Sequence, residues 1–229
     1  MTCLSCVIPA FNEAPRIGAV LAVACATPGI DEVIVVDDGS SDATAAIAEA
    51  HAAGCPQLRV IRRCRNGGKT RAVIDGVAAA RGDWLMLLDS DLRGLAPAHL
   101  AALAAPVLAG RAGAAVSLRA NAPRPWRAIG LDYISGERVM ARALLAQHLC
   151  ALEHLPRFGL EVFLNRLWLA EGLDIAVVDW PGVESPMKTV KQGQWRGLLA
   201  DVAMLRDIFS TIPPREALGQ IRALRARRI

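Results

Sequence analysis

The chain has 229 residues, enough for one sizeable α/β core, and 53% of them are hydrophobic. A net charge of +4 with only 4% aromatic residues argues against a nucleic-acid-binding protein, which needs a basic surface interleaved with aromatic side chains. No uninterrupted apolar stretch reaches the roughly 18 residues of a membrane span, and no targeting segment is visible. We therefore expect a cytoplasmic protein with at most peripheral contact with the inner face of a membrane.

The cysteines do not form two paired clusters with the spacing of a zinc site. They are Cys3, Cys6, Cys25, Cys55, Cys64 and Cys150. Cys3 and Cys6 form a lone C-x-x-C inside the first expected strand, where their side chains would point to opposite faces. We interpret them as buried thiols in a reducing cytosol rather than as a redox pair.

Short apolar runs alternate with helical patterns in the first part of the chain. The runs predict strands at residues 4–8, 33–36, 58–61 and 84–88. The last run is apolar throughout, as in a strand that is buried on both faces. This alternation predicts right-handed βαβ units and a parallel sheet.

The pattern is looser in the second part of the chain. We expect a strand at 114–118, a loop at 119–127, helices at 137–148 and 160–171, a strand at 175–178, an apolar helical stripe at 195–209 and a basic helix from 215 to the end. This gives one catalytic domain, residues 1–210, and a basic helical appendage, residues 211–229. The last helix has one apolar side, so it is either a solvated helix end or a helix that lies on an anionic membrane.

A polar cluster follows each of the first four strands, at residues 9–13, 37–40, 65–69 and 89–91. Ligands of open parallel sheets bind outside the carboxyl ends of the strands, so these clusters should meet at one rim. The last cluster, Asp89-Ser90-Asp91, offers two carboxylates for Mg²⁺ or Mn²⁺. Such an ion would bridge the two phosphates of a donor and offset charge on the leaving group.

The stretch Gly67-Gly68-Lys69-Thr70 suggests a rival function, because a strand followed by G-K-T and a helix resembles a P-loop. The full P-loop motif requires a glycine five residues before its second glycine, and Arg63 occupies that place. No G-x-G-x-x-G motif for a dinucleotide follows the first strand either. We therefore set both nucleotide-binding motifs aside.

Four motifs, in this order, resemble glycosyltransferase family 2. They are VIPAFNE at 7–13, VVDDGSSD at 35–42, NGGK at 66–69 and LLDSDL at 87–92. The chain is most similar to the dolichyl- and polyprenyl-phosphate sugar transferases and their small soluble relatives. The resemblance implies an α/β fold of the GT-A type, with a Rossmann-like, mostly parallel sheet flanked by helices. It also implies a UDP- or GDP-sugar donor, inversion at the anomeric carbon, and an acceptor such as a polyprenyl phosphate.

The resemblance also assigns roles to individual residues. Asp89 and Asp91 would hold the metal. The donor would contact Pro9, Ala10, Asn12, Glu13, Asp38, Gly39, Asn66, Lys69 and Ser90. Arg119, Ser135 and Arg138 would face the acceptor or its phosphate. Glu161 is a candidate general base on a helix, although a glutamate that only favours the helix N-terminus fits equally well. Asp132 is a weaker candidate base.

Two departures from the polyprenyl-phosphate branch concern the metal. Arg93 stands where that branch often has a third metal-binding residue, and no histidine occurs near residues 182–185, where water or Glu184 could replace it. Two alternatives therefore remain. One is a sugar-phosphate nucleotidyltransferase, which normally opens with a glycine-rich loop, and the other is a non-catalytic nucleotide-sugar-binding protein.

Overall fold

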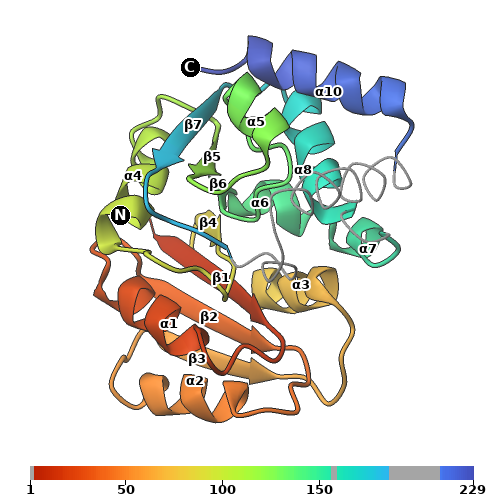
Figure 1. The fold of residues 1–229 in the computed structure, drawn as a ribbon. Helices are drawn as coiled ribbons and strands as arrows, with labels where there is room; N and C mark the ends of the chain where they lie inside the picture. Colours follow the sequence, from red (N-terminus) through yellow and green to blue (C-terminus); the bar gives the residue numbers. More distant parts are fainter. Residues whose placement is uncertain (1–2, 156–158, 186–211) are drawn as a thin grey trace, which may run out of the picture.

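The computed structural model describes residues 3–155, 159–185 and 212–229, which form a sheet with helices on both faces (Figure 1). The strands lie in the order β3-β2-β1-β4-β6-β5-β7. Their bounds are β1 Leu4–Ala10, β2 Glu32–Asp37, β3 Leu58–Arg62, β4 Trp84–Leu87, β5 Ala114–Arg119, β6 Arg138–Ala141 and β7 Ile175–Trp180. Only β6 runs antiparallel to its neighbours, β4 and β5. The predicted, mostly parallel sheet is therefore confirmed.

The helices form a layer on each face of the sheet. One layer contains α1 Ile17–Ala26, α2 Thr44–Ala52 and α4 Pro97–Leu108. The other contains α3 Lys69–Ala79, α5 Arg124–Ile129, α6 Arg142–Ala146, α7 Leu149–Leu152, α8 Gly159–Ala170 and α10 Pro214–Ala226. Successive strand side chains point to opposite faces, so in β1 Cys6 and Ile8 pack under α1 while Val7 packs under α3. The apolar strands bury both faces, as predicted.

Two predicted elements beyond the fourth strand were wrong. A helix was expected at residues 137–148. Residues 138–141 instead form strand β6, and helix α6 starts only at Arg142. Val139 and Met140 are fully buried there, because β6 is inserted between β4 and β5 and pairs with both. A four-residue run carries no clear period, so only the neighbouring strands determine its conformation. The expected loop at 119–127 also contains the start of α5, which follows Pro123.

The C-terminal helix α10 is a helix as predicted, and it packs against α8 at the top of the molecule in Figure 1. Leu224 is buried in the same core cluster as α8, and the buried hydroxyl of Tyr133 donates to Gln220 at 2.6 Å. After the helix, Arg228 forms a parallel bridge with Ile175 of β7. On the apolar side of α10, Leu224 is buried and Ile221 is half-buried, whereas Leu218 is 51% exposed. The predicted stripe at 195–209 and the predicted domain boundary at 210 lie outside the described residues.

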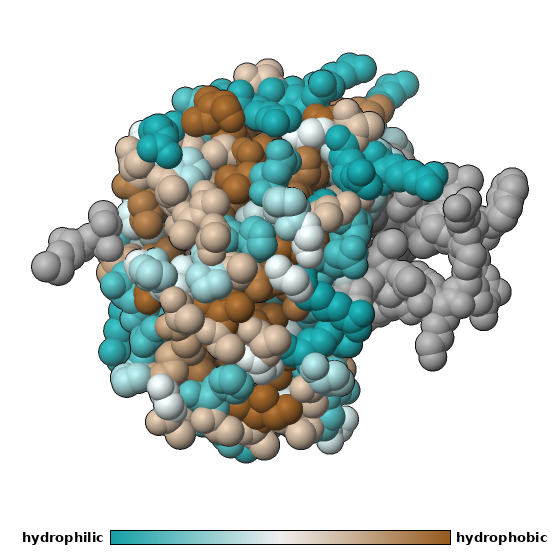
Figure 2. All heavy atoms as spheres, turned by 60° about the vertical axis from the view of Figure 1, so that its left-hand side comes forward, coloured by the Kyte–Doolittle hydropathy of each residue, from teal (hydrophilic) through white to brown (hydrophobic). Residues whose placement is uncertain are grey.

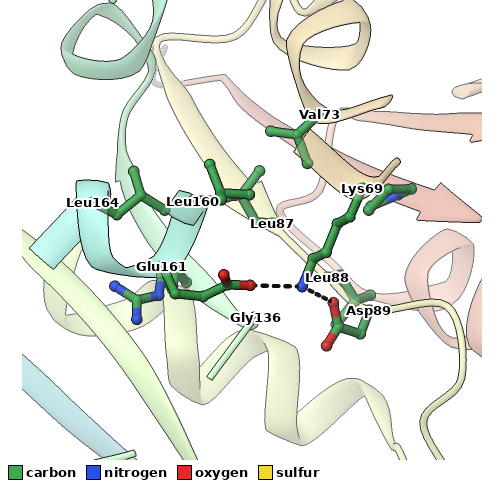
Figure 3. A pocket seen from close by; sticks show the side chains of 11 residues that line it. Lys69, Val73, Leu87, Leu88, Asp89, Gly136, Leu160, Glu161 and Leu164 are labelled. Atoms are coloured by element: carbon green, nitrogen blue, oxygen red, sulfur yellow. Dashed lines mark hydrogen bonds and ion pairs between the residues drawn. The ribbon is translucent and has the colours of Figure 1, made fainter. Parts of the chain in front are cut away.

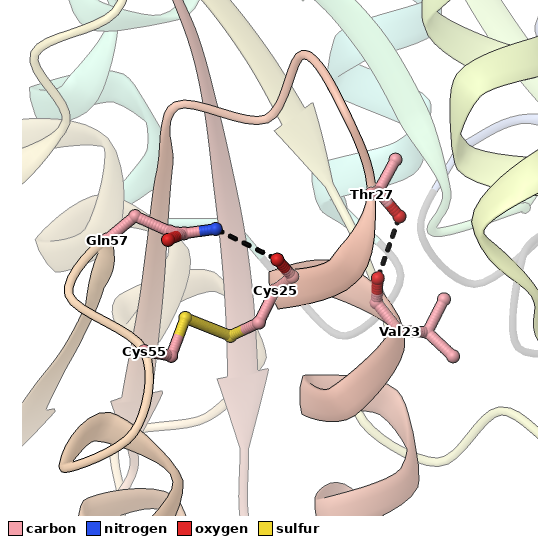
Figure 4. The surroundings of a disulfide bond; sticks show 5 residues. All are labelled: Val23, Cys25, Thr27, Cys55 and Gln57. Carbon is pink, nitrogen blue, oxygen red and sulfur yellow. Dashed lines mark hydrogen bonds between the residues drawn. A yellow bond between two sulfur atoms is a disulfide. The ribbon is translucent and has the colours of Figure 1, made fainter.

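A disulfide joins Cys25, near the end of α1, to Cys55, in the turn before β3 (Figure 4). The side chain of Gln57 donates to the carbonyl oxygen of Cys25 at 2.9 Å and holds the same two segments together. The interpretation of thiols in a reducing cytosol did not foresee this bond, because the pairing depends on the packing of α1 and α2 beside each other. Cys6 is a buried free thiol, as expected, whereas Cys64 and Cys150 are exposed.

None of the helices within the described ranges is long and apolar enough to cross a membrane. On the face drawn in Figure 2, hydrophobic residues are scattered among hydrophilic ones.

Candidate active site

An open cleft of about 320 Å³ lies at the carboxyl ends of β1, β2 and β4. Its lining contains nine residues that were predicted to contact the donor or the metal: Pro9, Ala10, Glu13, Asp38, Asn66, Lys69, Asp89, Ser90 and Asp91. Phe11 and Gly68, from the clusters at 9–13 and 65–69, also line the cleft, as does Ala72, and none of these three had been assigned a role. Phe11 is the most informative of these, because an aromatic ring that is 43% exposed at a cleft can stack on a ligand. Its position directly after the predicted strand could have indicated it.

The loop before α3 is held by Asp38. The carboxylate of Asp38 accepts hydrogen bonds from the backbone N–H groups of Gly67 and Gly68, at 3.0 and 2.7 Å, and pairs with Arg63. In a P-loop these amides would be free to bind a phosphate, so the hydrogen bonds exclude that rival function. Gly39 fits beneath the loop with a φ of +72°, and a Cβ on it would lie 2.7 Å from the backbone of Arg65.

Asn12 and Gly39 support the cleft without appearing among the residues that line it. Asn12 has a φ of +54°, and its side-chain oxygen accepts the N–H of Ser41 at 2.9 Å. This contact ties the loop after β1 to the loop after β2. Asn12 therefore shapes the cleft wall, whereas direct contact with a donor was expected.

Lys69, in the first turn of α3, connects the cleft to α8. Its ammonium group donates to Oδ1 of Asp89 at 2.8 Å and to Oε1 of Glu161 at 3.0 Å (Figure 3). Burial would lower the pKa of Lys69, but the two carboxylates outweigh that effect and hold the pKa above its ordinary value. Burial likewise favours a raised pKa for Asp89, but the charges of Lys69 and Arg119 keep that pKa low. Both groups are therefore charged at neutral pH.

Gly136, just before β6, allows Asp89 to take this position. A Cβ on Gly136 would lie 2.5 Å from Oδ1 and 2.6 Å from Oδ2 of Asp89. Only glycine leaves room for the carboxylate, because a Cβ at that distance overlaps it. The backbone of Gly136 therefore packs directly against the carboxylate of Asp89.

Asp91 has a different environment from Asp89. Burial and the negative charges of Asp89 and Glu13 raise its pKa to about 6. Its contacts are with Ser185, whose hydroxyl donates to both carboxylate oxygens, at 3.1 and 3.2 Å. Asp91 thus sits in an excess of negative charge that a cation would relieve.

The residues present fit a hard divalent cation. Asp89 and Asp91 supply carboxylate oxygens, the donor type that Mg²⁺ and Mn²⁺ prefer. Within the described part of the chain, no group of three or more histidine, cysteine, aspartate or glutamate side chains could hold a metal by itself. The remaining ligands would then be water and the oxygens of a bound diphosphate, as is usual for Mg²⁺ in phosphate sites.

The segment after β7 completes this side of the site. Glu184 pairs through its backbone with Arg93, with N–H···O distances of 2.8 and 3.0 Å, a contact that the sequence did not indicate. The side chain of Asn121 donates to the carbonyl oxygen of Ser185 at 2.7 Å. Ser185, rather than Glu184, therefore occupies the place next to Asp91 where the sequence left a gap. Ser185 lies within residues 182–185, where the late histidine of some relatives was expected, but no role of its own was predicted for it.

A buried charged network lies behind Asp89. The guanidinium of Arg119 pairs with Asp132 at 3.3 Å and with Glu137 at 3.4 Å, and both carboxylates are fully buried. Burial raises the pKa of Asp132, although the charge of Arg119 opposes this. Ser135 is also fully buried and donates to Glu137 at 2.7 Å. Asp132 therefore has no exposed surface from which to act as a base.

Two expected acceptor residues are enclosed by the protein. Ser135 belongs to the network around Glu137, and Arg138 is 1% exposed and donates to Asn165 and to backbone carbonyls. The Arg138 guanidinium also lies 4.8 Å from the ring centre of Trp168. The expectation of direct acceptor contact is corrected for both residues. Their side chains form hydrogen bonds within the protein, and the bond from Arg138 to Asn165 joins β6 to α8.

Comparison with known proteins identifies the family. Residues 5–153 match the family described as Glycosyl transferase family 2. The chain belongs to this family. The resemblance drawn from the four motifs is therefore confirmed, and family membership disfavours the nucleotidyltransferase alternative.

Curated relatives of this family 2 protein match less than two fifths of its length. It is 43% identical over 86 residues to the succinoglycan biosynthesis protein ExoO of Rhizobium meliloti, which covers 37% of this chain and 24% of ExoO. It is 38% identical over 99 residues to the dolichyl-phosphate beta-glucosyltransferase of Drosophila melanogaster, covering 38% and 30% of the two chains. A dodecaprenyl-phosphate galacturonate synthase of Rhizobium johnstonii is 38% identical over 96 residues, with coverage of 39% and 28%. The chain thus spans less than a third of each of these relatives.

Solved structures extend the similarity over the whole fold. Glucosyl-3-phosphoglycerate synthase from Mycobacterium tuberculosis, in complex with Mn²⁺, UDP-glucose and phosphoglyceric acid, is 27% identical with a TM-score of 0.68. The match covers 92% of this chain and 79% of that one. The predicted GT-A fold of this family 2 protein is therefore confirmed.

Proposed function

We propose that this protein transfers a sugar from a nucleotide-sugar donor to an acceptor, with a divalent metal at Asp89 and Asp91. The observation that carries the proposal is the cleft at the sheet rim, where Lys69, Asp89 and Asp91 meet. A cation and two carboxylates at one place suit a metal-bound diphosphate. The complex of the mycobacterial synthase with Mn²⁺ and UDP-glucose supports this reading.

Different residues of the cleft would contact different parts of the donor. Pro9, Ala10, Asp38 and Asn66 enclose the end of the cleft that suits the nucleoside, with Phe11 at its edge. Lys69 would donate to a phosphate oxygen. A metal held by Asp89 and Asp91 would supply Lewis-acid stabilisation of the departing nucleoside diphosphate. The acceptor oxygen would attack from the opposite face of the sugar, which inverts the anomeric carbon.

The pairing of the carboxylates in the site supports an acceptor that is already an anion and needs no base to deprotonate it. Asp89 and Glu161 share Lys69, Asp132 and Glu137 share Arg119, and Asp91 binds Ser185. Four of these five described carboxylates are paired with a cationic side chain, and Asp91 would hold the metal, so none of the five is left to act as a base. An acceptor phosphate needs no deprotonation, whereas a hydroxyl does. We therefore propose a polyprenyl phosphate as the acceptor, in line with the names of the Drosophila and Rhizobium johnstonii relatives.

A product assay tests the proposal. The protein is incubated with Mn²⁺, UDP-glucose or GDP-mannose, and either a short polyprenyl phosphate or 3-phosphoglycerate. Release of nucleoside diphosphate that depends on the polyprenyl phosphate is the expected result, and release with 3-phosphoglycerate alone would assign a hydroxyl acceptor. Pyrophosphate release from a nucleoside triphosphate and a sugar phosphate would instead identify a nucleotidyltransferase. Binding without turnover by any acceptor would identify a nucleotide-sugar-binding protein.

A further inference from the structure

Building on the proposed function, we infer that Glu161 is a positioning residue: it holds the Lys69 ammonium beside the donor diphosphate and does not deprotonate the acceptor. Glu161 lies in the first turn of α8, and Lys69 lies 92 residues earlier, at the start of α3. The contact between them joins α8 to the first turn of α3, which lines the donor cleft (Figure 3).

The surroundings of Glu161 exclude the role of a base. Its side chain is only 7% exposed and faces a small cavity of about 10 Å³, which Gly136, Arg138 and Leu164 also line. A cavity of that size holds about one water molecule and no sugar or lipid headgroup. The proton of an acceptor hydroxyl would have to lie within hydrogen-bond reach of the carboxylate, and the structure leaves no room for it.

Lys69 has the opposite exposure. Its side chain is 40% exposed, and it lines both this small cavity and the larger donor cleft. An ammonium group has three N–H donors, and Asp89 and Glu161 accept two of them. One donor therefore remains for the cleft, on the side where Asp91 also lies. That is the donor available to a phosphate oxygen.

Two carboxylates from different elements fix a side chain that is otherwise flexible. A free lysine side chain samples many rotamers, and a ligand that must immobilise it loses affinity. Asp89 alone would leave the ammonium free to pivot about one contact. With Glu161 in place, the ammonium is ordered before the donor binds, and the diphosphate gains a charge-assisted hydrogen bond at little additional cost.

A second ion pair, between α3 and the turn after α7, provides the matched control. Arg71, two residues after Lys69, pairs with Glu153 beyond α7 at 3.2 Å. Both side chains are more than 40% exposed, and neither lines the cleft. Glu153→Gln therefore removes the same kind of charge from the same side of the molecule without touching the donor site.

The test measures the affinity of UDP-glucose, GDP-mannose, UDP and uridine with Mn²⁺ by calorimetry. Glu161→Gln should weaken the nucleotide-sugar that binds the wild-type protein, and the corresponding diphosphate, by about tenfold, a typical effect of a lost charge-assisted contact. Uridine affinity, and all affinities of Glu153→Gln, should stay within about twofold. Lys69→Met should reproduce the loss, and the double variant should lose no more, because both changes disable one group.

The possible outcomes distinguish a failure of the proposed sugar transfer from a failure of the role inferred for Glu161. If neither nucleotide-sugar binds the wild-type protein, the proposed function is wrong and the inference with it. If a nucleotide-sugar binds equally well to Glu161→Gln while kcat falls by a hundredfold or more, Glu161 is a base and the inference alone is overturned. If Glu161→Gln does not fold, Lys69→Met decides, because an unchanged diphosphate affinity in that variant also overturns the inference.

Discussion

Gly136 packs so closely against Asp89 that a Cβ on Gly136 would lie 2.5 Å from Oδ1 of the carboxylate. Gly136→Ala should therefore displace Asp89, lower the transfer rate about a hundredfold and reduce stability by about 1–3 kcal/mol. Steady-state kinetics and urea unfolding measure the two effects. A variant with wild-type kinetics would show that the position of Asp89 does not matter.

Gly219 supplies the control for that substitution. It lies exposed within α10, and nothing lies within 4 Å of a Cβ placed on it. Gly219→Ala should leave the kinetics unchanged and raise stability by about 0.5–1 kcal/mol, because alanine favours a helix interior over glycine.

The pairing of Arg119 with Asp132 and Glu137 predicts a large stability effect. Arg119→Met leaves two fully buried carboxylates without their counter-charge and should destabilise the protein by about 3–5 kcal/mol. The exposed pair between Arg62 and Glu49 is the comparison, and Arg62→Gln should cost less than about 1 kcal/mol. Equal unfolding midpoints in urea for the two variants would contradict this account of the network.

The disulfide between Cys25 and Cys55 closes a loop of 30 residues in sequence separation. Cys25→Ser should lower the free energy of unfolding by about 2–4 kcal/mol under non-reducing conditions. A reducing agent should lower the stability of the wild-type protein by a similar amount and leave Cys25→Ser unchanged. Cys64→Ser, at an exposed free thiol, should behave as the wild type. A wild-type protein insensitive to reduction would show that the bond does not form in solution.

Most of the donor side of the site could be predicted from the sequence, because each polar cluster directly follows a strand. Parallel strands bring their carboxyl ends to one rim, so local motifs such as 37–40 and 89–91 become neighbours without further information. Lys69 was anticipated in the same way, since it opens the helix after β3.

The second half of the site depends on contacts that no local pattern reveals. Ser185 reaches Asp91 across 94 residues, and β6 becomes a strand only because it fits between β4 and β5. The resemblance assigned Ser135 and Arg138 to the acceptor, and the sequence could not show that hydrogen bonds enclose them. Glu161 was predicted to be either a base or a glutamate at a helix start, and its contact with Lys69 is a tertiary one.

The most direct test of the central claim is the thermal stabilisation of the protein by nucleotide-sugars in the presence and absence of Mn²⁺. We predict that at least one of UDP-glucose and GDP-mannose raises the unfolding temperature only when Mn²⁺ is present, and that Asp91→Ala abolishes this increase while its unfolding temperature without ligand stays close to that of the wild type. Stabilisation that is independent of Mn²⁺, or that Asp91→Ala retains in full, would contradict a metal-bound diphosphate at Asp89 and Asp91.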